Sequence, residues 1–241
     1  MKIFPSLMPT DLHRVKNIIK QLEPYCAGFH LDVMDGEFVS NTAWDIHAIN
    51  AIRHMTNKQL WIHMMVVNPE KYTHLMVYKQ DIISLHYESF CTKSCNPVKL
   101  PPAQKVIDPE YIKGCQESFV ALQRILPIVR ANGLRTSLTL NPLTPVGVIQ
   151  PLINLLDHVV LMSVEPGFAG QTFLPQTWGR LDELVNIKTI AHAPFTMGVD
   201  GGVTKAILKK LTKYKDIESV AVGSAIFKTA DPVATLKKLI S

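Results

Sequence analysis

The stretch His30-Leu-Asp-Val-Met-Asp-Gly36 lies at the centre of the pattern that predicts the fold. It follows the apolar run Ala27-Gly-Phe29 and ends in an Asp-Gly turn signal, so we expect a buried strand followed by a turn. Alternation along a strand places His30, Asp32 and Met34 on one face. An imidazole and a carboxylate on one face can bind the same divalent metal ion. The structural alternative is that His30 caps a neighbouring strand and Asp32 starts the turn.

Similar strand ends recur along the whole chain. Short apolar segments alternate with amphipathic segments, which predicts eight strands that alternate with eight helices. The predicted strands are 2–7, 27–32, 59–64, 81–86, 135–140, 158–162, 195–199 and 219–222. The predicted helices are about 10–22, 45–55, one that opens at 68–70, 110–131, 145–155, 176–190, 204–214 and 231–240.

This alternation predicts an α/β protein with parallel strands and right-handed crossovers. We expect a TIM (β/α)8 barrel formed by one domain over residues 1–241, with an open doubly wound sheet as the alternative. Polar residues at strand ends favour the barrel, because the carboxyl ends of all its strands meet at one mouth. These residues are Ser6, His30, Asp32, His63, His86, Asn141 and Asp200.

One segment interrupts the alternation. Residues 89–109 contain four prolines, three lysines and two cysteines without an apolar period, so we expect a long excursion after the fourth strand. Cys91, Cys95 and Cys115 lie close together in sequence, but a zinc site would need a fourth ligand and usually has tighter spacing. Because no secretory signal is recognised, we do not expect disulfides.

Composition excludes several classes of protein. The chain has 241 residues, of which 47% are hydrophobic, so it can fill a sizeable core. No apolar run reaches the roughly 18 residues that a membrane span needs. The net charge of +5 comes with scattered lysines rather than a basic patch, so no nucleic-acid partner is expected. The N-terminal residues do not form a signal peptide, and we expect a cytoplasmic protein without a membrane partner.

Four of the strand-end residues form a candidate metal site. His30, Asp32, His63 and Asp200 offer two imidazoles and two carboxylates, a set that suits one divalent ion of Zn, Fe, Mn or Co. In the structural alternative, His63 is a core histidine and Asp200 merely starts an Asp-Gly-Gly turn.

Glycine-rich turns follow the last three predicted strands. Glycine lets backbone N–H groups approach an anion, and the late loops of TIM barrels commonly bind phosphate. The turns are Gly167-Phe168-Ala169-Gly170, Asp200-Gly201-Gly202 and Gly223-Ser224. Ordinary turn chemistry is the alternative. Three methionines near strand ends could be core filler or an apolar floor beneath a charged intermediate: Met34, Met65 and Met162.

A metal site beside two carboxylates, together with a phosphate site, indicates proton transfer on a sugar phosphate. A C–H next to a carbonyl becomes acidic when the developing oxyanion is stabilised, as a metal ion would do. Inversion of that carbon needs one group that removes a proton and another that returns one from the opposite face. Asp32 and Asp200 are the expected pair.

The same segments resemble ribulose-phosphate 3-epimerases and the related allulose-6-phosphate 3-epimerases. They span nearly the whole chain, and the most specific are the His-x-Asp-x-Met-Asp-Gly element and the Pro-Gly-Phe loop. The matching segments are Pro5-Ser-Leu7, His30–Gly36, His63-Met-Met65, Leu140-Asn-Pro142, Met162–Gln171, Val199–Val203 and Val222–Phe227.

This resemblance implies a metal-dependent TIM-barrel epimerase that inverts C3 of a ketose phosphate through an enediolate. It implies that Asp32 and Asp200 are the acid/base pair, and that they bind the metal together with His30 and His63. It further implies a homo-oligomer. Substrate contacts are implied for Ser6, His63, Gly167, Phe168, Ala169, Gly170, Gly201, Gly202, Gly223 and Ser224.

The expected reaction converts D-ribulose 5-phosphate to D-xylulose 5-phosphate. The sequences Phe168-Ala-Gly170 and Ser6-Leu-Met8 resemble the allulose type more closely, so allulose 6-phosphate or another ketose phosphate remains an alternative substrate. A phosphate-binding decarboxylase would require a lysine among the strand-end carboxylates, and the Asp32 and His63 motifs have none. A catalytically silent sugar-phosphate sensor would have lost an acid/base group or a metal ligand.

Overall fold

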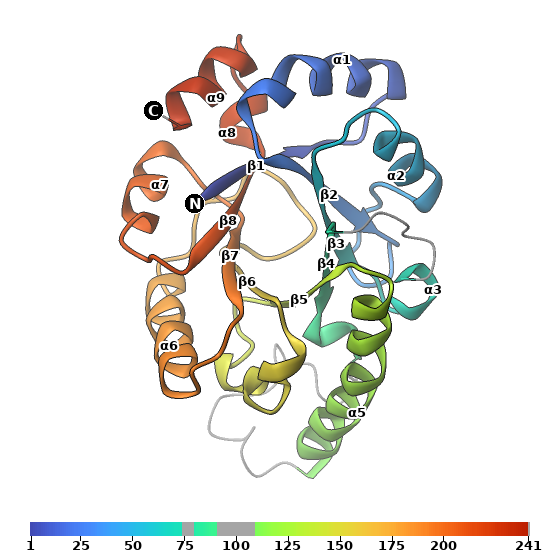
Figure 1. Cartoon of the computed structure of the whole chain (residues 1–241), viewed down its shortest axis with the longest axis vertical. Coiled ribbons are helices and arrows are strands. Elements are labelled where there is room, and N and C mark those ends of the chain that lie inside the picture. Colours follow the sequence, from blue (N-terminus) through green and yellow to red (C-terminus); the bar gives the residue numbers. More distant parts are fainter. Residues whose placement is uncertain (74–79, 91–108, 241) are drawn as a thin grey trace.

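The computed structural model describes residues 1–73, 80–90 and 109–240. Eight parallel strands close into a barrel in which each strand pairs with the next along the chain and β8 pairs with β1 (Figure 1). The strands are β1 (Lys2–Leu7), β2 (Gly28–Met34), β3 (Gln59–Met65), β4 (Ile82–His86), β5 (Arg135–Leu140), β6 (His158–Met162), β7 (Thr196–Asp200) and β8 (Ile217–Val222). The TIM barrel is therefore confirmed, and the open sheet is excluded.

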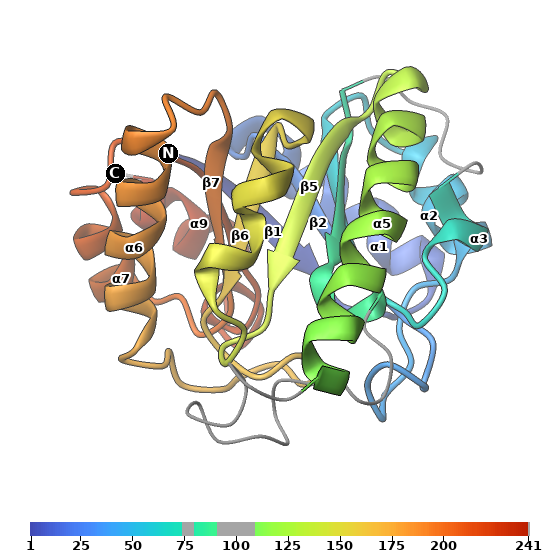
Figure 2. The same ribbon diagram turned by 90° about the horizontal axis from the view of Figure 1, so that it is seen from below.

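Helices surround the barrel. In Figure 2, α6 and α7 lie on one flank of the strands, and α2, α3 and α5 lie on the other. The α-helices are α1 (Leu12–Leu22), α2 (Ile46–Arg53), α3 (Glu70–Thr73), α5 (Pro109–Ala131), α6 (Thr177–Ile190), α7 (Lys205–Leu211), α8 (Ser224–Phe227) and α9 (Pro232–Ile240). The 3-10 helices are η1 (Glu23–Tyr25), η2 (Tyr87–Phe90) and η4 (Val146–Leu155).

Local sequence explains where several helices begin. The Asp11 carboxylate accepts a hydrogen bond from the Arg14 backbone N–H at 2.9 Å and caps α1. Asp45 caps α2 in the same way through the backbone N–H of Ala48 at 2.8 Å. Each cap satisfies a backbone donor that would otherwise lack a partner within its helix.

Three differences from the predicted elements matter. Strand β2 extends beyond the predicted end at residue 32 to Met34, and β7 extends beyond residue 199, so Asp200 lies inside a strand rather than after it. The predicted helix 145–155 is a 3-10 helix with Pro151 inside it, since proline lacks the N–H that a regular helix requires. The short helix α8 was not predicted. Most of the predicted excursion lies in residues 91–108, outside the described part of the chain. Cys91 and Cys95 lie in this range, and the side chain of Cys115 is also outside the described part.

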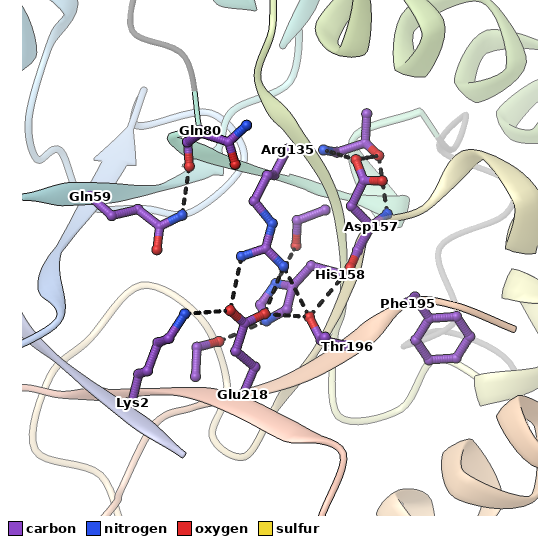
Figure 3. A network of polar contacts seen from close by, with 12 residues as sticks. Lys2, Gln59, Gln80, Arg135, Asp157, His158, Phe195, Thr196 and Glu218 are labelled. Atoms are coloured by element: carbon purple, nitrogen blue, oxygen red, sulfur yellow. Dashed lines mark hydrogen bonds and ion pairs between the residues drawn. The ribbon is translucent and has the colours of Figure 1, made fainter.

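The amino end of the barrel is closed by ionic contacts (Figure 3). The Arg135 guanidinium on β5 donates to the Glu218 carboxylate on β8 at 2.6 Å, and Lys2 on β1 donates to it at 2.8 Å. The Thr196 hydroxyl on β7 donates to the same carboxylate at 2.6 Å. One carboxylate thus joins four strands at the end opposite to the mouth.

A chain of buried hydrogen bonds also crosses the interior of the barrel. The Trp61 indole N–H donates to the Ser84 hydroxyl at 2.7 Å, and Ser84 donates to Ser137 at 2.8 Å. His158 lies between the Ser137 and Ser219 hydroxyls, at 3.0 and 2.7 Å. Burial lowers the pKa of His158 to about 3, with the Arg135 charge as a smaller cause, so this imidazole is neutral at physiological pH.

No helix in the described ranges 1–73, 80–90 and 109–240 is both long enough and apolar enough to cross a membrane.

Candidate active site

The four predicted metal ligands meet at the mouth of the barrel. His30 and Asp32 point inward from β2, as the predicted alternation requires, and Asp32 pairs in register with His63 on β3. Asp200 comes from the end of β7. One ligand atom from each of these residues lies within 4.8 Å of every other, which is close enough for one ion to contact all four.

The ring of His63 lies between the two carboxylates. Its Nδ1 atom is 3.1 Å from Asp32 Oδ1 and 3.1 Å from Asp200 Oδ2. His30 Nε2 is 3.5 Å from Asp200 Oδ2. That nitrogen is buried and has no hydrogen-bond partner within the described residues, although buried polar atoms are normally satisfied. The donor set and this orphaned nitrogen fit a divalent metal ion.

Charges within the cluster shift the pKa values of Asp32 and His63. Burial raises the pKa of Asp32, but the charge of His30 and the hydrogen bond and charge of His63 outweigh burial and lower it to about 2. Burial lowers the pKa of His63, but hydrogen bonds and charges from Asp200 and Asp32 raise it to about 9. A cation, whether a proton on His63 or a metal ion, is therefore stabilised between the carboxylates.

Ser6 links two of the proposed ligands. Its hydroxyl donates to Asp32 Oδ2 at 3.3 Å and lies 3.0 Å from His30 Nδ1. Because Ser6 Oγ acts as a donor towards Asp32, it accepts from the His30 Nδ1–H. This arrangement makes Nε2 the His30 nitrogen that faces Asp200 and is available to a metal ion.

One pocket gathers the residues that were predicted to contact substrate. Asp32, His63 and Asp200 line it, while His30 is fully buried beside them and does not. The three predicted floor residues also line it: Met34, Met65 and Met162. The remaining predicted contacts line the same pocket: Ser6, Gly167, Phe168, Ala169, Gly170, Gly201, Gly202, Gly223 and Ser224.

Glycine is required at two positions of this pocket. Gly202 has a φ of +61°, and a Cβ there would lie 2.4 Å from the backbone nitrogen of Phe173. Gly170 has a φ of +86°, and a Cβ there would lie 2.7 Å from Lys228 Nζ. The second observation places the Lys228 ammonium group beside Gly170.

Sequence reasoning missed Lys228 as a neighbour of the pocket. It lies just after α8, and no hydrogen bond or ion pair of its ammonium group is found in the described part of the chain. The only signal was its position four residues after Ser224, which is one turn of helix.

His86 and Glu88 were also missed as neighbours of the metal cluster, although His86 was recognised as a strand-end residue. His86 Nε2 lies 2.7 Å from His63 Nε2, and His86 Nδ1 lies 3.2 Å from Glu88 Oε2. Burial lowers the pKa of His86, so its imidazole is neutral. Burial raises the pKa of Glu88, but hydrogen bonds from His86, Thr144 and the Asn141 backbone N–H outweigh burial and lower it, so Glu88 is ionised.

Comparison with known proteins shows the family of this chain. The profile of the ribulose-phosphate 3 epimerase family matches residues 2–100 and 96–227, which is most of the chain. The chain belongs to the ribulose-phosphate 3-epimerase family. The protein is therefore an isomerase that acts on carbohydrates, as the resemblance of its sequence segments implied.

Individual members of the ribulose-phosphate 3-epimerase family match along nearly the whole chain. The chloroplastic ribulose-5-phosphate-3-epimerase of Arabidopsis thaliana is 29% identical over 98% of this chain and 74% of its own length. Ribulose-phosphate 3-epimerase of Bacillus subtilis is 29% identical over 96% of this chain and 94% of its own length.

Solved structures support the fold alone. A 3-hexulose-6-phosphate synthase superposes with a TM-score of 0.57 and 15% identity, covering 99% of this chain and 98% of its own. A tryptophan synthase α-subunit from Pyrococcus furiosus gives a TM-score of 0.62 and 14% identity, covering 99% and 96%. The same barrel therefore supports different chemistries, and function has to be argued from the site.

Proposed function

We propose that this protein is a metal-dependent epimerase that inverts C3 of a ketose phosphate, converting D-ribulose 5-phosphate to D-xylulose 5-phosphate. One observation carries the proposal: the carboxylates of Asp32 and Asp200 reach the same His63 nitrogen, each at 3.1 Å, from different strands of the barrel. Two carboxylates that approach one small volume from separate strands can act on the two faces of a single carbon.

His30, Asp32, His63 and Asp200 would hold the metal ion. When bound, a Zn, Fe, Mn or Co ion supplies positive charge that makes the C3 hydrogen of a ketose more acidic. The buried His30 Nε2, which lacks a hydrogen-bond partner among the described residues, supports this assignment.

Asp32 and Asp200 would move the protons. In the proposed direction, Asp32 takes the C3 proton, which leaves an enediolate, and Asp200 delivers a proton that it has taken from solvent to the opposite face. The low pKa of Asp32 means that it starts ionised and able to accept a proton. The hydrogen bond from Ser6 at 3.3 Å holds the Asp32 carboxylate in place. The reverse reaction exchanges the roles of the two groups.

The phosphate would bind at the other side of the pocket. The turns that contain Gly170, Gly202 and Gly223 line this side, where backbone can approach an anion closely. Lys228 would add the positive charge, because its ammonium group lies against Gly170. The apolar side chains of Met34, Met65 and Met162 would exclude water from the reacting carbon.

The proposed enzyme is a cytoplasmic homo-oligomer. Its family resemblance supports the oligomer, and a relative from Oryza sativa, 26% identical over 99% of this chain, is named as a cytoplasmic isoform. Light scattering coupled to size-exclusion chromatography tests the oligomer, and a monomer at enzyme-assay concentrations would contradict it.

A coupled epimerisation assay on purified, metal-reconstituted protein tests the function. It is run in parallel with D-ribulose 5-phosphate and allulose 6-phosphate, because Phe168-Ala-Gly170 resembles the allulose type. We expect a higher kcat/KM for D-ribulose 5-phosphate. A preference for allulose 6-phosphate would keep the chemistry and correct the substrate. Turnover of neither compound would favour a catalytically silent sugar-phosphate-binding barrel.

A further inference from the structure

A buried chain of hydrogen bonds leads away from the proposed metal centre through His63. His63 Nε2 and His86 Nε2 are 2.7 Å apart, and the two rings are inclined by only 19°. His86 Nδ1 lies 3.2 Å from Glu88 Oε2. The His86 side chain is fully buried and that of Glu88 is 7% exposed, so water cannot readily replace these contacts.

The carboxylate fixes the direction of every bond in this chain. Glu88 Oε1 accepts from the Asn141 backbone N–H and the Thr144 hydroxyl, as a carboxylate does, so the His86 nitrogen that faces Oε2, Nδ1, carries a proton. A neutral imidazole has one donor and one acceptor, so His86 Nε2 is the acceptor. His63 Nε2 must then donate. Nδ1 is therefore the nitrogen of His63 that presents a lone pair toward Asp32 and Asp200 when a metal ion is bound.

We propose that His86 and Glu88 are positioning residues that hold His63 in the tautomer and ring orientation required of a metal ligand. This inference rests on the metal centre of the proposed function. With the opposite tautomer, a proton on Nδ1 would occupy the direction in which the ion binds. Partners of this kind commonly orient metal-binding histidines and raise their basicity.

Glu88 is itself held by the turn after β5, and α6 holds that turn. Its Oε1 accepts from the Asn141 backbone N–H at 3.0 Å and from the Thr144 hydroxyl. Arg180 on α6 donates to the carbonyl oxygens of Asn141 and Thr144 at 2.8 and 2.9 Å, which fixes the turn after β5. The orientation of His63 thus depends on contacts that involve β4, the turn after β5 and α6, and not on one flexible side chain.

The substitution Glu88→Gln tests this inference with little change in side-chain volume. A glutamine amide can donate to His86 Nδ1 and so permits the opposite tautomer. We expect the affinity for Zn²⁺, measured without substrate by competition with a chromophoric chelator, to fall about 10- to 100-fold. Two-bond ¹H–¹⁵N NMR of the histidine rings reads the tautomers, with His86→Gln assigning the signals. Wild-type His86 should carry its proton on Nδ1, and Glu88→Gln should shift it toward Nε2.

Glu218→Gln is the matched control, since it makes the same chemical change at the opposite end of the barrel. It should leave Zn²⁺ affinity and the tautomers of His63 and His86 unchanged, while thermal melting shows that both variants fold. Unchanged zinc affinity in Glu88→Gln, or an equal loss in Glu218→Gln, would overturn the inference. A wild-type protein that binds zinc but carries the His86 proton on Nε2 would overturn the inference alone. A wild-type protein that binds no divalent metal would overturn the metal centre of the proposed function as well.

Discussion

At the scale of single residues, the site depends on which atoms face one another across the mouth. Asp32 and Asp200 both approach His63 Nδ1 at 3.1 Å, while Ser6 bridges His30 and Asp32. Removing a charge here changes chemistry with little loss of packing, because the carboxylates remain partly exposed to the pocket.

Asp200→Asn should nearly abolish epimerisation. The amide keeps the volume of the carboxylate but can neither take nor return the proton, which typically costs 10²- to 10⁴-fold in rate. It also removes a charged metal ligand, so kcat and metal content are measured together. The melting temperature should stay near that of the wild type. Wild-type turnover in a folded Asp200→Asn protein would exclude the two-carboxylate mechanism.

Lys228→Met should weaken binding of a phosphorylated substrate. The lysine ammonium lies against Gly170, so its loss removes charge near the proposed phosphate position and not near the proposed metal ligands. We expect KM for the ketose phosphate to rise about 10-fold, which corresponds to about 1.4 kcal/mol, with kcat nearly unchanged. Lys213→Met, at an exposed lysine after α7, is the control. Equal KM values in the two variants would show that Lys228 does not contact the phosphate.

Sequence alone selected the four residues that the structure brings together as a candidate metal site, but it did not select the residues that support them. Strand alternation was enough to place His30 and Asp32 on one inner face, and the glycine turns fell after the predicted strands. Glu88 could not be recognised, because its contact with His86 depends on a short 3-10 helix that turns the chain back toward the mouth. Lys228 was missed since nothing in its neighbours indicates that its side chain reaches Gly170.

At the scale of elements, register joins distant residues into one site. Parallel pairing sets Asp32 beside His63 and Met162 beside Asp200. The short apolar runs predicted all eight strands because buried parallel strands are nearly continuous in hydrophobicity. Apolar periodicity could not distinguish the 3-10 helix η4 from an α-helix, because the spacing of apolar residues is similar in both. The proline inside η4 disfavours the α-helical form.

Glu218→Gln should destabilise the fold without altering the site. Its carboxylate accepts from Arg135, Lys2 and Thr196 and so joins β1, β5, β7 and β8. Losing charge-assisted bonds to partly buried partners should lower the free energy of unfolding by about 1–3 kcal/mol, measured by urea denaturation. Glu183→Gln on an exposed part of α6 should change it by less than about 0.5 kcal/mol. Equal unfolding midpoints for the two variants would contradict a stabilising role.

At the scale of the whole molecule, the barrel separates function from stability. The mouth carries the carboxylates and the proposed metal ligands, while the opposite end carries the ionic network of Figure 3 and the buried chain around His158. The pKa of His63 at the mouth is raised and that of His158 near the other end is lowered, so these two histidines affect stability oppositely as pH changes.

The metal-free protein should therefore be most stable near pH 6.5. The pKa of His158 falls from 6.5 to about 3 on folding, so its contribution is complete above 6.5 and is lost as pH falls. The pKa of His63 rises from 6.5 to about 9, so its contribution is present below 6.5 and is lost as pH rises. On either side of this maximum, the histidine concerned changes the free energy of unfolding by at most about 1.4 kcal/mol per pH unit.

Urea unfolding in the presence of a chelator, at pH values of about 5, 6.5 and 8.5, checks this curve. Saturating Zn²⁺ should reduce the loss of unfolding free energy between about pH 6.5 and 8.5, because the ion replaces the proton at His63. His158→Asn should reduce the loss between about pH 6.5 and 5. A stability that rises steadily from about pH 5 to 8.5 without metal would contradict the protonation of His63 between the two carboxylates.

The two-carboxylate mechanism is tested most directly by turnover in D₂O. Metal-reconstituted protein is incubated with D-ribulose 5-phosphate, and hydrogen at C3 of the product is measured by NMR and mass spectrometry. Because one carboxylate removes the substrate proton and the other supplies a solvent-derived one, D-xylulose 5-phosphate should carry deuterium at C3. A product that keeps the original hydrogen at C3, or the absence of any product, would contradict the mechanism.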